Sequence, residues 1–468
     1  MSFRFGSPTL APIGRSVLLL LLAVVLLPVG AHAQAPRGGA ADTTAPLLTL
    51  EAVVDRVTRE GFAVRVARGD ARTAARNATI GNAGYLPTLD ATMIHQGTEA
   101  SRLSTGGLTG PGGVPVSNLT SYNSTTAGLG LTWTAIDLSR GPTLRRLRAD
   151  RLRADRVADA TLDDALQGAI TAYFDVVRQE QLLDAIRETV ALSEERLRLA
   201  EVQFRAGTAS ELDAGLARVD LNADRSALLQ QEAVRVALQS ELSRRMGGTG
   251  TERFTVVDSI SVDRALRLDA LLQTAPEENR QLAAARQTFL ASELGVRETR
   301  RQRLPTLSLQ TGYQWSGFAE GTEPDLFNQD DSFTYGATLS LPLFDGFNRR
   351  REIATAQIQV DNARVAVEQQ ESLLRAALVA AHARYRSGLD QMALEGENVT
   401  VARRNVDIAY AQLRTGTITA VDLRQVQLSL LDAQTRLLDA TFAAKRAETE
   451  LRRLSGTIAV PASAHDAR

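Results

Sequence analysis

Two short segments of this chain carry the side chains best placed to act on a charged ligand. Each has an arginine, then a Gly-Thr pair, then an aspartate: Arg205, Gly207, Thr208 and Asp213 in one, and Arg414, Gly416, Thr417 and Asp422 in the other. A carboxylate in such a loop can hold a cation. It can also cap a helix, because Ser210-x-x-Asp213 and Thr419-x-x-Asp422 have the spacing of a capping box. Both interpretations stay open for each aspartate.

Other kinds of site find little support in the composition. The chain has no cysteine, which excludes disulfides, thiolate metal sites and a cysteine nucleophile. Its four histidines are far apart in sequence, and no serine elbow or phosphate-binding loop is present. We therefore expect no catalytic residues, no metal, no cofactor and no enzymatic activity. A net charge of −1 gives no support to a nucleic-acid partner.

The duplicated motif belongs to a much longer internal repeat. Leu242–Gly247 resembles Leu451–Gly456, and Tyr85–Leu89 resembles Arg303–Leu307. The sequence predicts a first repeat over 47–250, a linker over 251–267 and a second repeat over 268–456, followed by a C-terminal tail over 457–468. Such duplication is typical of an architecture with internal pseudo-symmetry.

The N-terminus has the features of an export signal. Arg4 and Arg15 precede an apolar run from Val17 to Leu27. After this run, Ala31-His32-Ala33 is a small-x-small cleavage site. We expect a signal peptide over 1–33 and a flexible tail over 34–46. Without cysteine, the mature N-terminus cannot carry a thioether-linked lipid.

Four segments alternate apolar and polar residues with the period of a β-strand. We predict strands at about 86–97, 122–137, 305–316 and 332–344. A soluble sheet has this pattern too, but the export signal, the strand length and the aromatic residues near the strand ends favour an outer-membrane barrel. Those residues are Tyr85, Tyr122, Trp315, Phe333 and Tyr335. Four strands cannot close a spanning barrel, so an outer-membrane barrel would require several copies of the chain.

Long helices account for most of the remaining chain. Apolar residues recur at coiled-coil spacing, and proline is absent from long stretches, so we predict helices at about 142–205, 210–246, 346–413 and 419–455. Each repeat also begins with a helical segment, over 48–82 and about 268–302. A dimeric coiled coil explains the heptads but not the strands inserted between the helices. Arginines 140, 145, 146, 148, 151 and 349–351 are expected to form solvated helix faces.

This combination resembles the TolC family of outer-membrane efflux proteins over about residues 47–456. The features that carry the resemblance are the export signal, the two strand–strand–hairpin repeats and the paired Gly-Thr-x-x-x-x-Asp tips. It implies an α+β membrane protein: a homotrimer with a shared twelve-stranded β-barrel, four strands per chain, continued by a long periplasmic α-helical barrel of coiled-coil hairpins. It also places the arginine cluster near lipid headgroups of the outer membrane.

The resemblance also implies roles for residues at the hairpin tips. Residues expected to contact a periplasmic adaptor are Ala206, Gly207, Thr208, Asp213, Thr415, Gly416 and Thr417. Asp422 corresponds to an aspartate that lines the pore constriction, and Gln425 stands where a second ring aspartate is expected. Leu413 and Ile418 replace the family's gating tyrosine and arginine.

The predicted function is that of a passive outer-membrane channel in a tripartite efflux or type I secretion system. The expected partners are a periplasmic adaptor (membrane fusion) protein and an inner-membrane pump, such as a resistance-nodulation-division or ABC transporter. A non-conducting periplasmic adaptor or coiled-coil scaffold is the alternative, because it too would be built from long hairpins.

Overall fold

The computed structural model describes residues 46–103, 117–208, 210–256, 259–320 and 329–458. The predicted signal peptide and nearly all of the two predicted tails lie outside these residues. The described chain follows the duplicated order expected from the sequence, with two short helices, two strands and a long helical hairpin in each repeat.

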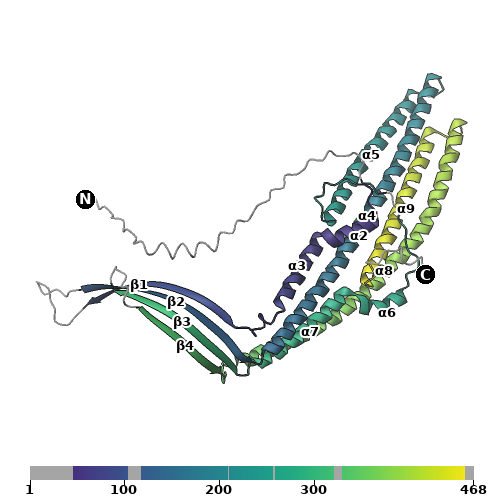
Figure 1. Cartoon of the computed structure of the whole chain (residues 1–468). Coiled ribbons are helices and arrows are strands. Elements are labelled where there is room, and N and C mark those ends of the chain that lie inside the picture. The colour runs from purple at the N-terminus through teal and green to yellow at the C-terminus, as the bar shows by residue number, and fades with distance from the viewer. Residues whose placement is uncertain (1–45, 104–116, 209, 257–258, 321–328, 459–468) are drawn as a thin grey trace, which may run out of the picture. The chain divides into compact units, whose positions relative to one another are not determined.

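Each repeat contains one long helical hairpin (Figure 1). In the first, α4 (Arg140–Arg205) turns into α5 (Glu211–Arg245), and in the second, α8 (Asn348–Arg414) turns into α9 (Ala420–Leu454). With 66 and 67 residues, α4 and α8 are each about 100 Å long at 1.5 Å per residue. Helix α9 packs against both α8 and α4, which brings the two hairpins together.

The helical segment that opens each repeat is divided, contrary to the single helix expected from the sequence. Helices α2 (Leu50–Glu60) and α3 (Phe62–Asn77) are separated by Gly61. Helices α6 (Leu268–Glu278) and α7 (Arg280–Arg301) are separated by Asn279.

Local chemistry explains the two breaks. Asn279 caps α7 by accepting the backbone N–H of Leu282 at 2.8 Å, and its amide donates to the backbone oxygen of Leu454 at 3.0 Å. At Gly61, a Cβ would lie 2.6 Å from the oxygen of Val57, a distance that only glycine tolerates.

The strands form one antiparallel sheet in the order β1 (Thr88–Leu103), β2 (Ser117–Asp137), β3 (Thr306–Glu320), β4 (Gln329–Ser340). Strand pairing between β2 and β3 joins the two repeats. The strands β1 and β2 are longer than predicted, whereas β4 ends at Ser340 and not near 344. Pro342 follows this end, and proline cannot donate to a strand ladder. Within the described chain, the outer edges of β1 and β4 have no partner strand.

Two hydrophobic cores lie where the short helices pack on the hairpins, one in each repeat. Tyr173 and Tyr385 are fully buried at corresponding places. The predicted linker is packed and not free, because Phe254 is buried in the first core. Ile458 is also buried there, so the packed chain continues beyond the predicted start of the C-terminal tail.

Candidate functional site

The turn at each hairpin tip is closed by a glycine in the left-handed conformation. Gly207 has φ +74° and Gly416 has φ +72°. Thr208 then donates its backbone N–H to the oxygen of Gln203 at 2.9 Å, and Thr417 donates in the same way to Gln412 at 2.9 Å. This bond and the glycine geometry are those of a Schellman cap, which satisfies the last carbonyl groups of the helix.

Both capping boxes that the sequence indicates are present. Asp213 accepts the backbone N–H of Ser210 at 3.1 Å, and Asp422 accepts that of Thr419 at 2.9 Å. In return, the hydroxyl oxygens of Ser210 and Thr419 each accept a backbone N–H from the aspartate at 3.2 Å. Each hydroxyl also donates to its aspartate, at 2.8 Å and 2.7 Å. Both aspartates therefore cap a helix, whatever further role either one has.

The residues predicted to line the constriction are on the surface of α9. Asp422 and Gln425 are both exposed, and their spacing of three residues places them on neighbouring turns of one helix face. Hydrogen bonds from the side chain and backbone of Thr419 lower the pKa of Asp422. The carboxylate therefore stays charged at pH values below the usual range for aspartate. The predicted adaptor-contact residues are also exposed, apart from the half-buried Asp213.

A buried ionic cluster beside the second tip was not anticipated from the sequence. Arg424 on α9 donates two hydrogen bonds to Asp224 on α5, at 2.8 Å and 2.7 Å. Asp224 also accepts a hydrogen bond from Ser193 of α4 at 2.6 Å. Asp224 and Ser193 are buried, and hydrogen bonding to Asp224 raises the pKa of Arg424. The cluster therefore joins the second hairpin to both helices of the first, and Arg424 lies two residues after Asp422 on α9.

Two members of the arginine cluster are not part of a solvated helix face, which corrects that expectation for them. Arg140 is buried, donates to the backbone oxygen of Thr134 and lies 5.6 Å above the ring of Tyr85. Arg146 forms ion pairs with Glu298 of α7 and, at 3.0 Å, with Asp150. These arginines join α4 to neighbouring elements, because planar guanidinium groups satisfy several acceptors at once.

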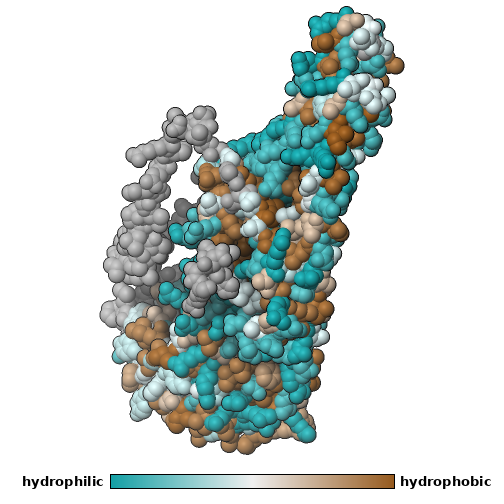
Figure 2. Space-filling view, turned by 90° about the vertical axis from the view of Figure 1, so that its right-hand side faces the viewer, coloured by the Kyte–Doolittle hydropathy of each residue, from teal (hydrophilic) through white to brown (hydrophobic). Residues whose placement is uncertain are grey.

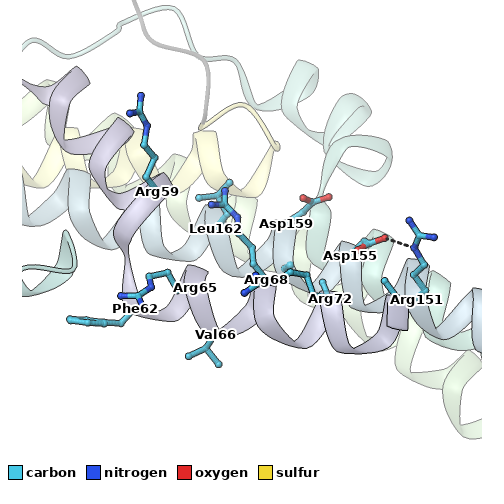
Figure 3. A pocket seen from close by; sticks show the side chains of 13 residues that line it. Arg59, Phe62, Arg65, Val66, Arg68, Arg72, Arg151, Asp155, Asp159 and Leu162 are labelled. Atoms are coloured by element: carbon cyan, nitrogen blue, oxygen red, sulfur yellow. Dashed lines mark ion pairs between the residues drawn. The ribbon is translucent and has the colours of Figure 1, made fainter. Parts of the chain in front are cut away.

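A groove with a volume of about 1140 Å³ runs along α3 and α4 (Figure 3). Its lining is rich in arginine and includes the exposed apolar residues Phe62 and Val66. The only acidic residues in its lining are Asp155 and Asp159. Asp155 is paired with Arg151 at 3.9 Å. The groove therefore resembles an unfilled packing surface more than a reaction centre.

The described residues contain no group of three or more histidine, cysteine or acidic residues that could hold a metal ion. None of their helices combines the length and the apolar character needed to cross a membrane.

Comparison with known proteins adds to this geometry. The family described as Outer membrane efflux protein matches residues 54–248 and 271–457, two ranges that correspond to the two repeats. Protein CyaE of Bordetella pertussis is 26% identical over 355 residues, which cover 74% of this chain and 71% of that protein. Outer membrane protein TolC of Salmonella enteritidis is 26% identical over 339 residues, covering 68% and 66%. The fold is similar to that of the Campylobacter jejuni CmeC outer membrane channel, with a TM-score of 0.67, 16% identity and coverage of 92% and 93%.

Proposed function

Because the chain belongs to the outer membrane efflux protein family, we propose that it is the outer-membrane duct of a tripartite efflux or type I secretion system. In this role it passively conducts substrates that an inner-membrane pump and a periplasmic adaptor deliver. The observation that carries the proposal is the family match over both repeats, each of which contributes two strands and a long hairpin with a capped tip. A channel of this kind performs no chemistry on its cargo.

The proposal includes a homotrimer, supported by the unequal surroundings of the two repeats. In the second repeat, α7 packs against both α4 and α8. In the first, the corresponding helix α3 packs mainly on α4 and leaves Phe62 and Val66 exposed on the groove of Figure 3. A second copy that presents α8 to this face would give α3 the two neighbours that α7 already has.

The surface of α8 offers a matching apolar face. Exposed apolar residues recur along it at intervals close to one or two heptads: Ile358, Val365, Leu373, Val379, Leu394, Val401 and Ile408. Figure 2 shows apolar side chains among hydrophilic ones on the outside of the molecule. A heptad stripe exposed in one copy is the seam that a neighbouring helix covers in a coiled coil. The free edges of β1 and β4 would pair between copies in the same assembly, closing a twelve-stranded barrel.

The hairpin tips are the proposed contact surface for the adaptor. Their backbone groups are satisfied by the Schellman and capping-box bonds, and the hydroxyls of Thr208 and Thr415 donate to backbone oxygens within the turns. The tips therefore present a compact, exposed surface on which the small Gly207 and Gly416 let another helical hairpin approach closely. We place Asp422 and Gln425 at the pore constriction, with one carboxylate from each subunit in the trimer.

The first experiment tests the duct itself. Purified protein in mild detergent is expected to have the mass of a trimer and to form ion-conducting channels in planar bilayers. Monomeric protein without conductance would contradict the proposal. A scaffold or adaptor would also separate from the outer membrane on cell fractionation, which the duct would not.

The second experiment tests the constriction. The Asp422→Ala variant is expected to raise conductance or to weaken block by multivalent cations, because it removes both side-chain bulk and a negative charge from the proposed constriction. Since the pKa of Asp422 is lowered, block of the unmodified channel should persist as the pH falls through the usual range of aspartate. Asp213→Ala is the matched control, with the same capping role in the first repeat. Equal conductance and block in both variants would leave Asp422 as a helix cap only.

A further inference from the structure

A groove lies between the two helices of the second hairpin, α8 and α9, and has a volume of about 370 Å³. At its floor the two helices touch, because a Cβ on Gly388 would lie 2.9 Å from the Cβ of Ala444. The longer side chains beside this crossing form the walls. The charged residues of the lining are Arg384, Arg446 and Glu450, so the groove has a net positive charge.

One of the two arginines in the groove is not neutralised by the chain. Arg384 is paired with Glu450 at 2.8 Å. Arg446 is exposed and forms no hydrogen bond or ion pair with any residue that the structure describes. Ser387 and Gln391 add polar groups to the lining, and the Gln391 amide donates to the Ser387 hydroxyl at 3.1 Å. A free guanidinium group in such surroundings suits a carboxylate or a phosphate, both of which it can bind through two parallel hydrogen bonds.

The first hairpin lacks both arginines of the groove. Counted from the buried tyrosines and from the tip glycines, the positions that correspond to Arg384 and Arg446 are Ala172 and Ala237. A hairpin of the same plan therefore folds with alanine at both places. The packing of α8 on α9 does not explain the two arginines, and a ligand for them does.

The groove lies on the face of α9 that also carries the proposed constriction. Arg446 follows Gln425 by three heptads (21 residues, from 425 to 446), and Ala443 of the groove follows Asp422 by the same interval. Residues at heptad spacing stay on one side of a coiled coil. Because Asp422 and Gln425 are placed at the constriction, Arg446 faces the bore of the proposed duct about 30 Å further along, at 1.5 Å per residue.

The other side of the second hairpin is covered by the short helices. Tyr385 is buried there in the second core together with Leu271 of α6. Ser387 in the groove lies about 200° round α8 from Tyr385, at 3.6 residues per turn. Both walls of the groove belong to one chain, and α9 packs against α4 and α8 of that same chain. The apolar face of α8 is what the proposed trimer gives to a neighbouring copy, and Arg446 on α9 is not part of it.

We propose that this groove binds the acidic groups of cargo inside the duct, with Arg446 holding the carboxylate or phosphate and Arg384 supplying a second positive charge. The inference rests on the proposed function, because it requires the groove to line a bore. Each copy supplies one groove, so a trimer has three at the same level. A cleft with excess positive charge concentrates anions, and these grooves would therefore attract anionic cargo that has passed the negatively charged constriction.

Thiol labelling of the full-length protein measures the charge of the groove. The chain has no cysteine, so Ser387→Cys introduces its only thiol. A negatively charged methanethiosulfonate reagent is expected to modify this thiol about tenfold faster than a positively charged one of similar size, because the arginines concentrate anions. Arg446→Gln, which breaks no ion pair, should remove most of this preference. Equal rates for the two reagents, or an unchanged preference in Arg446→Gln, would overturn the proposal.

The matched control is Arg375→Gln, which removes the same charge from an exposed position on α8 outside the groove. It should retain the preference for the negative reagent. A loss as large as that in Arg446→Gln would mean that the preference comes from the overall charge of the hairpin, which also overturns the proposal.

Single-channel recording in planar bilayers separates the groove from the duct. Modification of the thiol at position 387 is expected to lower the conductance. If the protein forms no channels, the proposed function fails. If channels form and modification leaves their conductance unchanged, the duct stands, but the groove does not line its bore and the inference is overturned.

Protection of the same thiol identifies the acidic group. Acetate and inorganic phosphate are compared at equal ionic strength, and at least one should slow the labelling in the protein with Arg446 and not in Arg446→Gln. The stronger protector is the group that the site prefers. No protection by either anion would overturn the proposal. Loss of the trimer in Arg446→Gln would do so as well, since a neighbouring copy would then cover this arginine.

Discussion

The two hairpin tips share their turn and cap but differ one turn further along the returning helix. In the first repeat, Gly215 follows the capping box, and a side chain at that position would meet nothing within 4 Å. In the second, Arg424 follows the equivalent box and is bound by Asp224 and Ser193 of the first hairpin. The local chemistry of the turn is duplicated, whereas the contact between repeats is made once.

This difference follows from what each repeat has beside it. Turn and cap residues satisfy backbone groups within a few positions, so both copies retain them in any surroundings. A residue that faces another element depends on that neighbour, and in the described chain α9 of the second hairpin packs on α4 of the first. Four predictions test how far the two repeats differ.

Removing Arg424 should have the largest effect. Arg424→Ala leaves Asp224 charged and buried without its partner, which is expected to lower the free energy of unfolding by roughly 3–5 kcal/mol. Denaturant unfolding of the detergent-solubilised protein measures this change. Arg218→Ala breaks the exposed pair with Glu201 and should alter stability by only about 0–1 kcal/mol. Similar effects in the two variants would mean that the buried cluster does not join the hairpins.

Left-handed glycines lie in two different surroundings. Gly207 and Gly416 are at the hairpin tips, whereas Gly247 and Gly456 lie against the ends of the short helices α2 and α6. A Cβ at Gly247 would lie 2.2 Å from the oxygen of Glu60, and one at Gly456 would lie 2.3 Å from that of Glu278. Alanine there adds a backbone clash to the left-handed penalty. At Gly207 and Gly416, which face open space, alanine should lower stability only by that penalty, about 1–2 kcal/mol.

Thermal unfolding of the four single alanine variants checks this prediction. The Gly247 and Gly456 variants are expected to unfold well below the two tip variants, and the members of each pair should be alike. An equal loss of thermal stability at all four positions would show that the backbone of the short helices can move to relieve the clash with the new Cβ atoms.

The contact between α7 and α4 predicts a pH effect. Asp163 is buried beside Arg280, 3.1 Å away, and burial raises its pKa from 3.8 to about 6. A raised pKa means that the folded state binds the proton more tightly than the unfolded state. The stability from this group is therefore fully present below about pH 4 and is lost as the pH rises through about 6.

Replacement of Asp163 by asparagine should remove that loss, so the melting temperature of the variant should fall less than that of the unmodified protein between about pH 4 and 6. The Asp184→Asn variant controls for the loss of one carboxylate, because Asp184 is exposed on the same helix as Asp163. If the melting temperatures of Asp163→Asn and of the unmodified protein changed equally with pH, the raised pKa of Asp163 would be contradicted.

The smallest effects are expected from the two N-caps, and here the repeats should agree. Ser210→Ala and Thr419→Ala each remove a hydroxyl that accepts a backbone N–H at 3.2 Å. Each should lower stability by about 0.5–2 kcal/mol. Protease cleavage at the tips, followed over time, would show whether both turns open equally. A much larger effect at Thr419 would mean that its cap is coupled to the Arg424 cluster.

Local sequence signals predicted the elements better than their contacts. The resemblance to the TolC family is confirmed by the family match, and the capping boxes are present as their spacing indicates. The breaks at Gly61 and Asn279 were missed because the helical periodicity continues on both sides of each. The burial of Arg140 could not be predicted from the sequence either, since its partners Thr134 and Tyr85 lie in other parts of the chain.

The sequence by itself determined the duplicated plan, the capped glycine tips and the alternating strands, because these features depend on residues close together in the chain. Tertiary structure alone decided which charged groups are buried, such as the pairing of Arg424 with Asp224, 200 positions away. Burial and ion pairing depend on neighbours that folding brings together, and the spacing of residues along a chain does not encode them directly.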